Sequence, residues 1–188
     1  MGQTTTAVSQ HLANGAVGVG ENHEDQKARS VVLKVIAQGL VTNLFLELYQ
    51  VTYGATIQAA QNQIHQGAQG AQLMLGTVDS GASSRGHAPN AIPLSRVILA
   101  AIVQGDVAIH CADGRFGNHQ NGGTPARMMG RNQECGNIFA QVTNAQDALH
   151  ANARGSLILF VGAHFENAGS ANHPIQHYIP NLTVVMCG

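Results

Sequence analysis

Short apolar runs alternate along the chain with longer segments in which apolar residues recur every three or four positions. The apolar runs predict five strands, at 15–20, 41–48, 107–112, 156–161 and 181–186. The periodic segments predict helices over 24–38, 93–105 and 124–153. Residues 50–66 suit a further helix, whereas the Gly-, Ala- and Ser-rich segment 67–90 predicts a loop with one helical turn.

This alternation of strands and helices predicts the α/β class, with a mainly parallel central sheet and helices on both faces. A chain of 188 residues is long enough for one domain with a substantial core, and it shows no internal repeat or linker. We therefore expect a single α/β domain over 15–188. Residues 1–14 are polar and are expected to form a loosely held lead-in.

The first strand runs into a turn that carries a carboxylate and an imidazole, in the sequence Gly18-Val19-Gly20-Glu21-Asn22-His23. Acidic residues follow at the start of the next helix, where the helix dipole favours negative charge. In open α/β sheets, ligands bind at the carboxyl ends of the strands. Glu21 and His23 are therefore candidates for a functional site.

Three further strands also end in polar groups, namely Glu47, Asp113 and His164. A parallel sheet places all these ends at one edge, so the carboxylates and imidazoles can meet in one cleft. Carboxylates held close together require a cation or shared protons. Each group alone is more often structural, but their common placement favours a site. His23, Glu47 and His164 are expected to be ligands of a divalent metal or, without metal, the general-base set. A remaining carboxylate could activate water.

The composition narrows the class of protein. Hydrophobic residues make up 44 % of the chain and charged residues 10 %, with a formal net charge of -1. This balance is globular and gives no electrostatic basis for binding nucleic acid. The scattered cysteines at positions 111, 135 and 187 predict buried free thiols and no disulfide framework.

The sequence also gives expectations about membrane insertion and the cellular compartment. No apolar run approaches the roughly 20 residues of a membrane span, so we expect no transmembrane segment. We see no signal peptide and expect a cytoplasmic protein. Gly2 and Thr6 fit the pattern for N-myristoylation.

The strand-end segments resemble the motifs of a known superfamily. The segment Gly20-Glu21-Asn22-His23, the strand end Leu44-Phe45-Leu46-Glu47 and the segment Phe160-Val161-Gly162-Ala163-His164 occur in order along the chain. Together they resemble the superfamily that contains the TIKI and TraB proteins, the erythromycin esterases, ChaN-like haem-binding lipoproteins and related domains of bacterial toxins. The pair Arg131-Asn132 and the acid Asp113 are similar to features of the ChaN-like and toxin branches.

The resemblance implies a hydrolase, either a metal-dependent protease of the TIKI type or an esterase that activates water with His and Glu. Glu21 would then orient His23 or activate water, and Asp113 would bind metal or orient a histidine. Arg131 would stabilise an anionic intermediate or hold a substrate carboxylate. The substrate would be a peptide or an ester, and the compact size and Lys-poor surface resemble a toxin or effector module delivered into a host cell.

Two alternatives remain open at this point. ChaN-like relatives bind haem or iron, so the chain could be a haem- or metal-binding module without catalysis. Tyr49, Tyr53 and histidines would then supply axial ligands. His119, in the polar loop after Asp113, is the remaining candidate for contact with a bound cofactor or substrate. The second alternative is a degenerate member that acts through protein contacts only.

Overall fold

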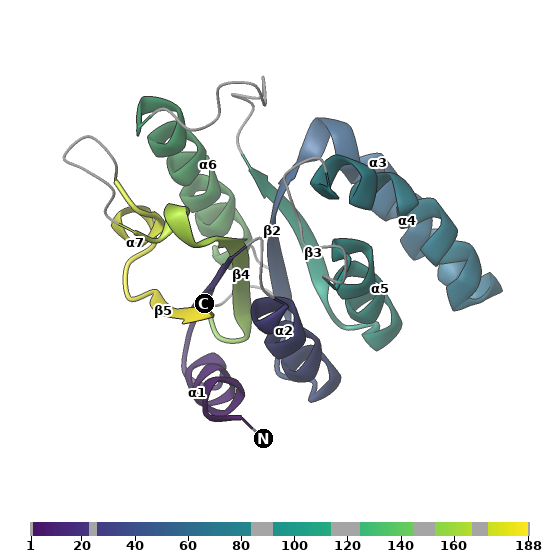
Figure 1. Cartoon of the computed structure of the whole chain (residues 1–188), viewed down its shortest axis with the longest axis horizontal. Coiled ribbons are helices and arrows are strands. Elements are labelled where there is room, and N and C mark those ends of the chain that lie inside the picture. Colours follow the sequence, from purple (N-terminus) through teal and green to yellow (C-terminus); the bar gives the residue numbers. More distant parts are fainter. Residues whose placement is uncertain are drawn as a thin grey trace.

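The structure, a computed structural model, describes residues 2–22, 26–83, 92–113, 125–144, 153–166 and 173–187. Its centre is a five-stranded, all-parallel sheet in the order β3-β2-β4-β1-β5 (Figure 1). The strands are β1 (Val17–Glu21), β2 (Asn43–Tyr49), β3 (Ala108–Asp113), β4 (Ser156–Val161) and β5 (Thr183–Cys187). This arrangement confirms the predicted α/β class with a parallel sheet.

The strand order results from one reversal of the chain. From β1 the chain moves to β2 and then to β3 at one edge, and it returns to insert β4 between β2 and β1. The inserted strand, Ser156-Leu157-Ile158-Leu159-Phe160-Val161, is buried over its first five residues. A continuous apolar run is typical of a central parallel strand that is covered on both faces. The strand ends that carry polar groups therefore lie on both sides of a fully buried strand.

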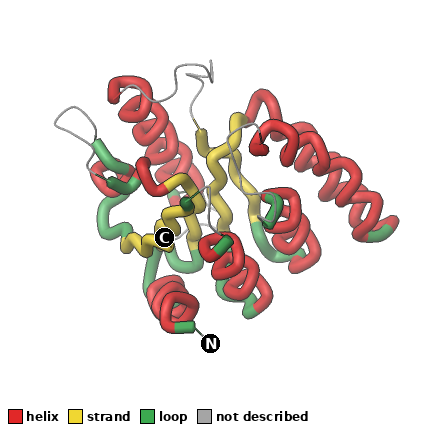
Figure 2. The backbone as a smooth tube through the Cα atoms, in the orientation of Figure 1, coloured by secondary structure: helices red, strands yellow, loops and turns green. Residues whose placement is uncertain are grey.

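Helices cover both faces of the sheet (Figures 1 and 2). One core contains residues of α1 (Gln3–Leu12), α2 (Lys27–Ala37), α3 (Gln50–Gln63), α4 (Ala68–Ser83) and α5 (Leu94–Gln104). The other core contains residues of α6 (Pro125–Thr143) and its neighbour α7 (Ile175–Tyr178). A 3₁₀ turn, Ile64–Gln66, joins α3 to α4. Side chains of β2 alternate between the two cores, because Leu44 and Leu46 belong to the first and Phe45 to the second.

Three sequence-based expectations about elements were wrong. The expected loose lead-in forms helix α1, in which Val8 and Leu12 are buried. The segment expected to be mostly loop forms α4, whose buried residues Ala71, Leu75 and Val78 contact the neighbouring helices. Both helices were missed because each buries only a few residues on one face, and one of these residues in each helix is polar or small, namely Thr5 in α1 and Ala71 in α4. The helix expected to reach residue 153 ends at Thr143.

The structure also bears on the predicted thiols and on the expected absence of a transmembrane segment. The three cysteines are buried and free, which confirms the predicted thiols. Within the described ranges, no helix combines the length and the apolar character that a bilayer span requires.

The burial of α1 leads to a prediction about stability. Leu12 is 1 % exposed in the core, so Leu12→Ala should lower the free energy of unfolding by about 2–5 kcal/mol. The matched control is Leu73→Ala, because Leu73 is 77 % exposed on α4 and its truncation should change stability by no more than about 0.5 kcal/mol. Urea denaturation of both variants measures the difference. Equal effects would show that α1 does not contribute to the core.

Candidate functional site

The carboxyl ends of the strands place several predicted site residues along one edge of the sheet. In spatial order the ends carry Asp113 on β3, Glu47 on β2, His164 after β4 and Glu21 on β1. The register between β2 and β3 shifts between Leu46 and Tyr49, so Glu47 lies in an irregular part of its strand. Such irregularities change the direction of a side chain. The edge therefore presents a strand residue whose carboxylate can reach its neighbours.

Arg131 on α6 joins two of these strand ends. Its Nε lies 2.6 Å from Asp113 Oδ1 and its Nη2 lies 2.8 Å from Asp113 Oδ2. The same Nη2 lies 2.6 Å from Glu47 Oε1. These are short, charge-assisted hydrogen bonds, and the pair with Asp113 is bidentate. Asp113 is fully buried, so the guanidinium compensates the cost of burying its charge.

The surrounding charges also fix the protonation state of Arg131. Burial by itself would lower the pKa of the guanidinium. The hydrogen bond to Asp113 and the negative charges of Glu47 and Asp113 outweigh this effect and raise the pKa above its usual value. Arg131 is therefore a permanent cation at this edge.

Glu47 also contacts β4 and His164. Its Oε2 accepts a hydrogen bond from the backbone N–H of Val161 at 2.9 Å, beyond the last paired residues of β2 and β4. Its Oε1 lies 3.5 Å from His164 Nε2. His164 belongs to the 3₁₀ turn Gly162–His164 that follows β4, and its ring packs edge-on against Phe160. The carboxylate thus lies between a permanent cation and an imidazole.

Two glycines allow the close approach of the segments around this turn. A Cβ added to Gly20 would lie 2.5 Å from Met186 Sδ and 3.3 Å from the Cα of Gly162. A Cβ added to Gly162 would lie 2.7 Å from Met186 Cε. In both cases the nearest atoms belong to the end of the Met186 side chain on β5. A side chain added at either glycine would therefore displace Met186.

Asn132 determines which nitrogen of His164 carries a proton. Its Nδ2 donates to the backbone carbonyl of His173 at 2.8 Å, so its Oδ1 is the atom that faces His164. That oxygen lies 2.5 Å from His164 Nδ1. Because an amide oxygen only accepts, Nδ1 must carry the hydrogen. The second ring nitrogen, Nε2, faces the carboxylate of Glu47.

The second nitrogen of His164 and the carboxylate of Glu47 face each other at the carboxyl ends of β2 and β4. Carboxylates and imidazoles are the side chains that most often transfer protons in active sites. Glu47 and His164 are therefore a described pair that could act as a base and an acid.

The two cysteines near the site do not supply a thiolate. Burial raises the pKa of Cys111 to about 12. Burial, and then the negative charges of Asp113 and Glu47, raise the pKa of Cys135 far above its usual value. Both thiols stay protonated at neutral pH, and a thiol is a much weaker nucleophile than a thiolate. The reactive groups of the described site are the carboxylate and the imidazole.

The structure places the other sequence-predicted residues as follows. Glu21 does not join the cluster through the contacts described above; its two oxygens lie 2.8 and 3.0 Å from Nε and Nη2 of Arg29. Arg29 also donates from Nη1 to the carbonyl of Ile92 at 2.8 Å. His23 and His119 lie outside the described residues.

The described residues do not by themselves form a metal site. They contain no group of three or more His, Cys, Asp and Glu side chains that could hold an ion. Of the expected ligands, Glu47 and His164 lie together. Two ligands are fewer than the three protein ligands of catalytic zinc sites. A metal at this site therefore requires His23, the third expected ligand.

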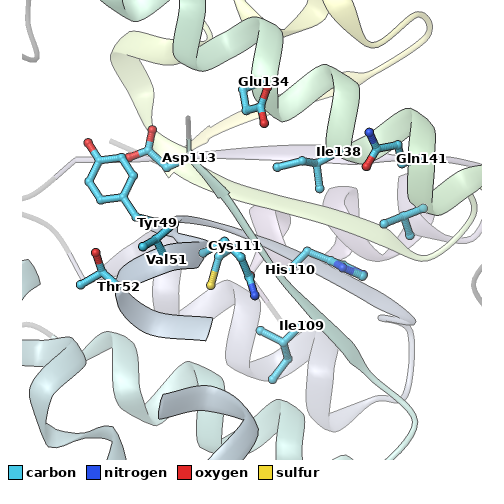
Figure 3. Close-up of a pocket in the computed structure, with 12 residues that line it drawn as sticks. Tyr49, Val51, Thr52, Ile109, His110, Cys111, Asp113, Glu134, Ile138 and Gln141 are labelled. Carbon is cyan, nitrogen blue, oxygen red and sulfur yellow. The ribbon is translucent and has the colours of Figure 1, made fainter. Parts of the chain in front are cut away.

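A groove begins at Asp113 and runs beside β3 (Figure 3). Its volume is about 750 Å³, in the range of small-molecule sites. Its lining includes Tyr49, Ile109, His110, Asp113, Glu134 and Ile138. In Figure 3, Glu134, Ile138 and Gln141 extend from α6 toward β3. Tyr49, an expected haem ligand, lies in this groove and next to Asp113 in the strand register.

Sequence reasoning missed the partners that orient the site. Arg131-Asn132 was singled out, but the contact of Asn132 with His164 was not expected. Arg29 was missed because it lies on the helix after Glu21, where a basic residue more often faces solvent. Glu134 was missed because the pattern of α6 does not show which residues face the groove. The polar pair Arg131-Asn132 in the sequence was the signal that could have predicted the contact of Asn132 with His164.

Comparisons with protein-family models, curated proteins and solved structures found no match to this chain.

The ion pairs of Arg131 lead to a second stability prediction. Arg131→Met should lower the free energy of unfolding by about 3–5 kcal/mol at pH 7, because it removes the guanidinium that binds the buried carboxylate of Asp113 and the carboxylate of Glu47. Urea denaturation measures this loss. Arg96→Met is the matched control on an exposed arginine, and a similar loss there would contradict the role of Arg131.

Proposed function

We propose that this protein is a hydrolase, an esterase or a peptidase, in which Glu47 and His164 activate water and protonate the leaving group. The observation that carries the proposal is the pair itself. Glu47 Oε1 lies 3.5 Å from His164 Nε2, while the other ring nitrogen is held by Asn132. A carboxylate and an imidazole in this relation are typical of general acid–base catalysis.

The proposed reaction uses Glu47 as the base and protonated His164 as the acid. A water molecule attacks the substrate carbonyl carbon while its proton moves to Glu47. The bond from that carbon to the leaving oxygen or nitrogen then breaks, and the leaving group takes the proton from His164 Nε2. Transfer of the proton from Glu47 to His164 restores the starting state. Every proton is thus returned, and no external oxidant or reductant is needed.

Arg131 and Asn132 act as positioning residues in this proposal. Arg131 orients Glu47, since its Nη2 is bound to Glu47 Oε1 and to Asp113. This differs from the expectation that its guanidinium contacts a substrate anion, because Nε and Nη2 are already occupied. Asn132 keeps the proton of His164 on Nδ1 and so leaves Nε2 for the reaction.

Metal assistance remains a prediction. It requires a third ligand, for which His23 is the expected residue, and the metal content of protein purified without added metal is the measurement. Stoichiometric zinc, manganese or iron that is lost in His23→Ala would support it.

The direct test is the activity of conservative variants of the pair. Glu47→Gln and His164→Asn should each lower kcat about 10²–10⁴-fold, because each removes one proton-transfer group and keeps a similar shape. Hydrolysis of p-nitrophenyl acetate and of a fluorogenic casein measures the ester and peptide branches. Glu166→Gln and His65→Asn are matched controls on exposed residues and should keep full activity. Wild-type rates in both pair variants would refute the proposal.

Haem binding is the second candidate function, because Tyr49 and His110 both line the groove beside β3. The apolar residues Ile109 and Ile138 line the same groove and suit a macrocycle. On this alternative, haem titration should give a Soret band that is lost or shifted in Tyr49→Phe or in His110→Ala. His65→Ala should leave the band unchanged. An absorbance spectrum that does not differ between wild type and these two variants would exclude it.

A further inference from the structure

One edge of the sheet is formed by β3, which pairs only with β2 among the strands in the described ranges. The backbone N–H of Ala108 donates to the carbonyl of Thr42 at 2.9 Å, so the peptide groups of Ala108 point toward β2. Backbone groups in a strand alternate in direction with a period of two. Ile109 and Cys111 therefore direct their N–H and C=O groups away from β2, toward the outer edge.

The groove described above encloses this outer edge. The side chain of Cys111 belongs to the core formed with α3, α4 and α5, whereas the ring of His110 stacks on Phe45 of the opposite core, with ring centres 4.7 Å apart. Both residues nevertheless line the same groove. A cavity that touches both faces of a strand must run along its edge. The start of α3 forms one wall and α6 the other (Figure 3).

We propose that an extended peptide binds in this groove as a sixth strand, paired with the backbone of Ile109 and Cys111. The backbone groups of β3 repeat every ~3.3 Å, a spacing that another extended polypeptide matches group by group. A haem or a lipid headgroup cannot satisfy such a row of alternating donors and acceptors. Exposed edges are templates for strand pairing, and native proteins usually block them.

The charge of the groove specifies the peptide further. Glu134 extends from α6 into the groove, and no ion pair to it is formed by residues in the described ranges (Figure 3). A carboxylate beside an apolar wall favours a basic side chain and disfavours an acidic one. The peptide is therefore expected to carry Arg or Lys where it passes Glu134, with apolar side chains beside Ile138.

The proposed strand site names a class of substrate for the proposed hydrolase. Only the expectation that the bound peptide is cleaved rests on the proposed function. Asp113 lines the groove and is also bound to Arg131, which holds Glu47. A peptide that follows β3 toward its carboxyl end thus approaches the proposed catalytic pair. Binding along the edge does not itself require catalysis, so the two proposals can be tested separately.

The test uses amide NMR spectra of the whole chain carrying Glu47→Gln, which prevents hydrolysis during the measurement. The probe is a pool of hexapeptides with Arg at the third position and mixed residues elsewhere. We expect the amide signals of Ile109 and Cys111 to shift and their hydrogen exchange to slow. The same pool with every peptide nitrogen methylated should cause neither effect. No change with the first pool, or equal changes with both, would overturn the inference.

Two variants identify the groups that bind. Ile109→Pro removes one outward N–H while leaving the ladder to β2 intact, and it should weaken binding of the pool about three- to tenfold. Glu134→Gln should reduce the preference for the Arg pool over a matching Gln pool about two- to fivefold, and Glu166→Gln should not. A preference unchanged by Glu134→Gln would overturn the charge assignment. If Ile109→Pro does not fold, the methylated pool decides the question.

The results of these experiments distinguish the strand site from the proposed hydrolase activity. Binding at Ile109 and Cys111 by a pool that wild-type protein does not cleave supports the strand site and counts against the hydrolase. Cleavage of the pool with no effect at these amides supports the hydrolase and refutes the strand site.

Discussion

The buried ion pairs of Arg131 are the interaction on which the site depends. Asp113 and Glu47 come from neighbouring strands, and two carboxylates this close to one another in a low-dielectric site would repel strongly without a cation. Arg131 binds both at 2.6–2.8 Å and ties α6 to the carboxyl ends of β2 and β3. Buried ion pairs often contribute little net stability compared with apolar packing. What these contacts do in the structure is fix the carboxylates of Asp113 and Glu47 relative to α6.

Helix α6 sets the geometry of the site through consecutive side chains. Arg131 holds the acids, Asn132 holds the imidazole of His164, Glu134 lines the groove, and Cys135 lies in the core beneath. Because these residues span little more than one helical turn, a rotation or shift of the helix would move all of them together. The position of the helix is fixed by packing of Phe139 against Phe45 on the sheet. The core on this face therefore acts directly on the orientation of the proposed acid and base.

Much of the architecture follows from the sequence because buried parallel strands are nearly continuous apolar runs. The same runs place Glu47, Asp113 and His164 at strand ends. Periodicity could not show that Glu21 would pair with Arg29 instead, since a strand end does not specify which cation reaches it. It also missed α1 and α4, whose few buried residues gain their stability from tertiary contacts. The contact between Asn132 and His164 depends on the rotation of a helix over the sheet, which residue types alone do not determine.

Helices flank both edge strands of the sheet. The edge strand β5 is contacted by α1 and α2, and the edge strand β3 is contacted by α3, α5 and α6. Beside β3, a cavity of about 750 Å³ lies between α3 and α6. Flanking helices prevent the broad edge-to-edge contact of two sheets, but a single extended chain is narrow enough to enter. Because the groove ends at Asp113, one residue connects the open edge with the Arg131 network. An edge that is narrowed by flanking helices favours the proposed binding of a single peptide strand over self-association.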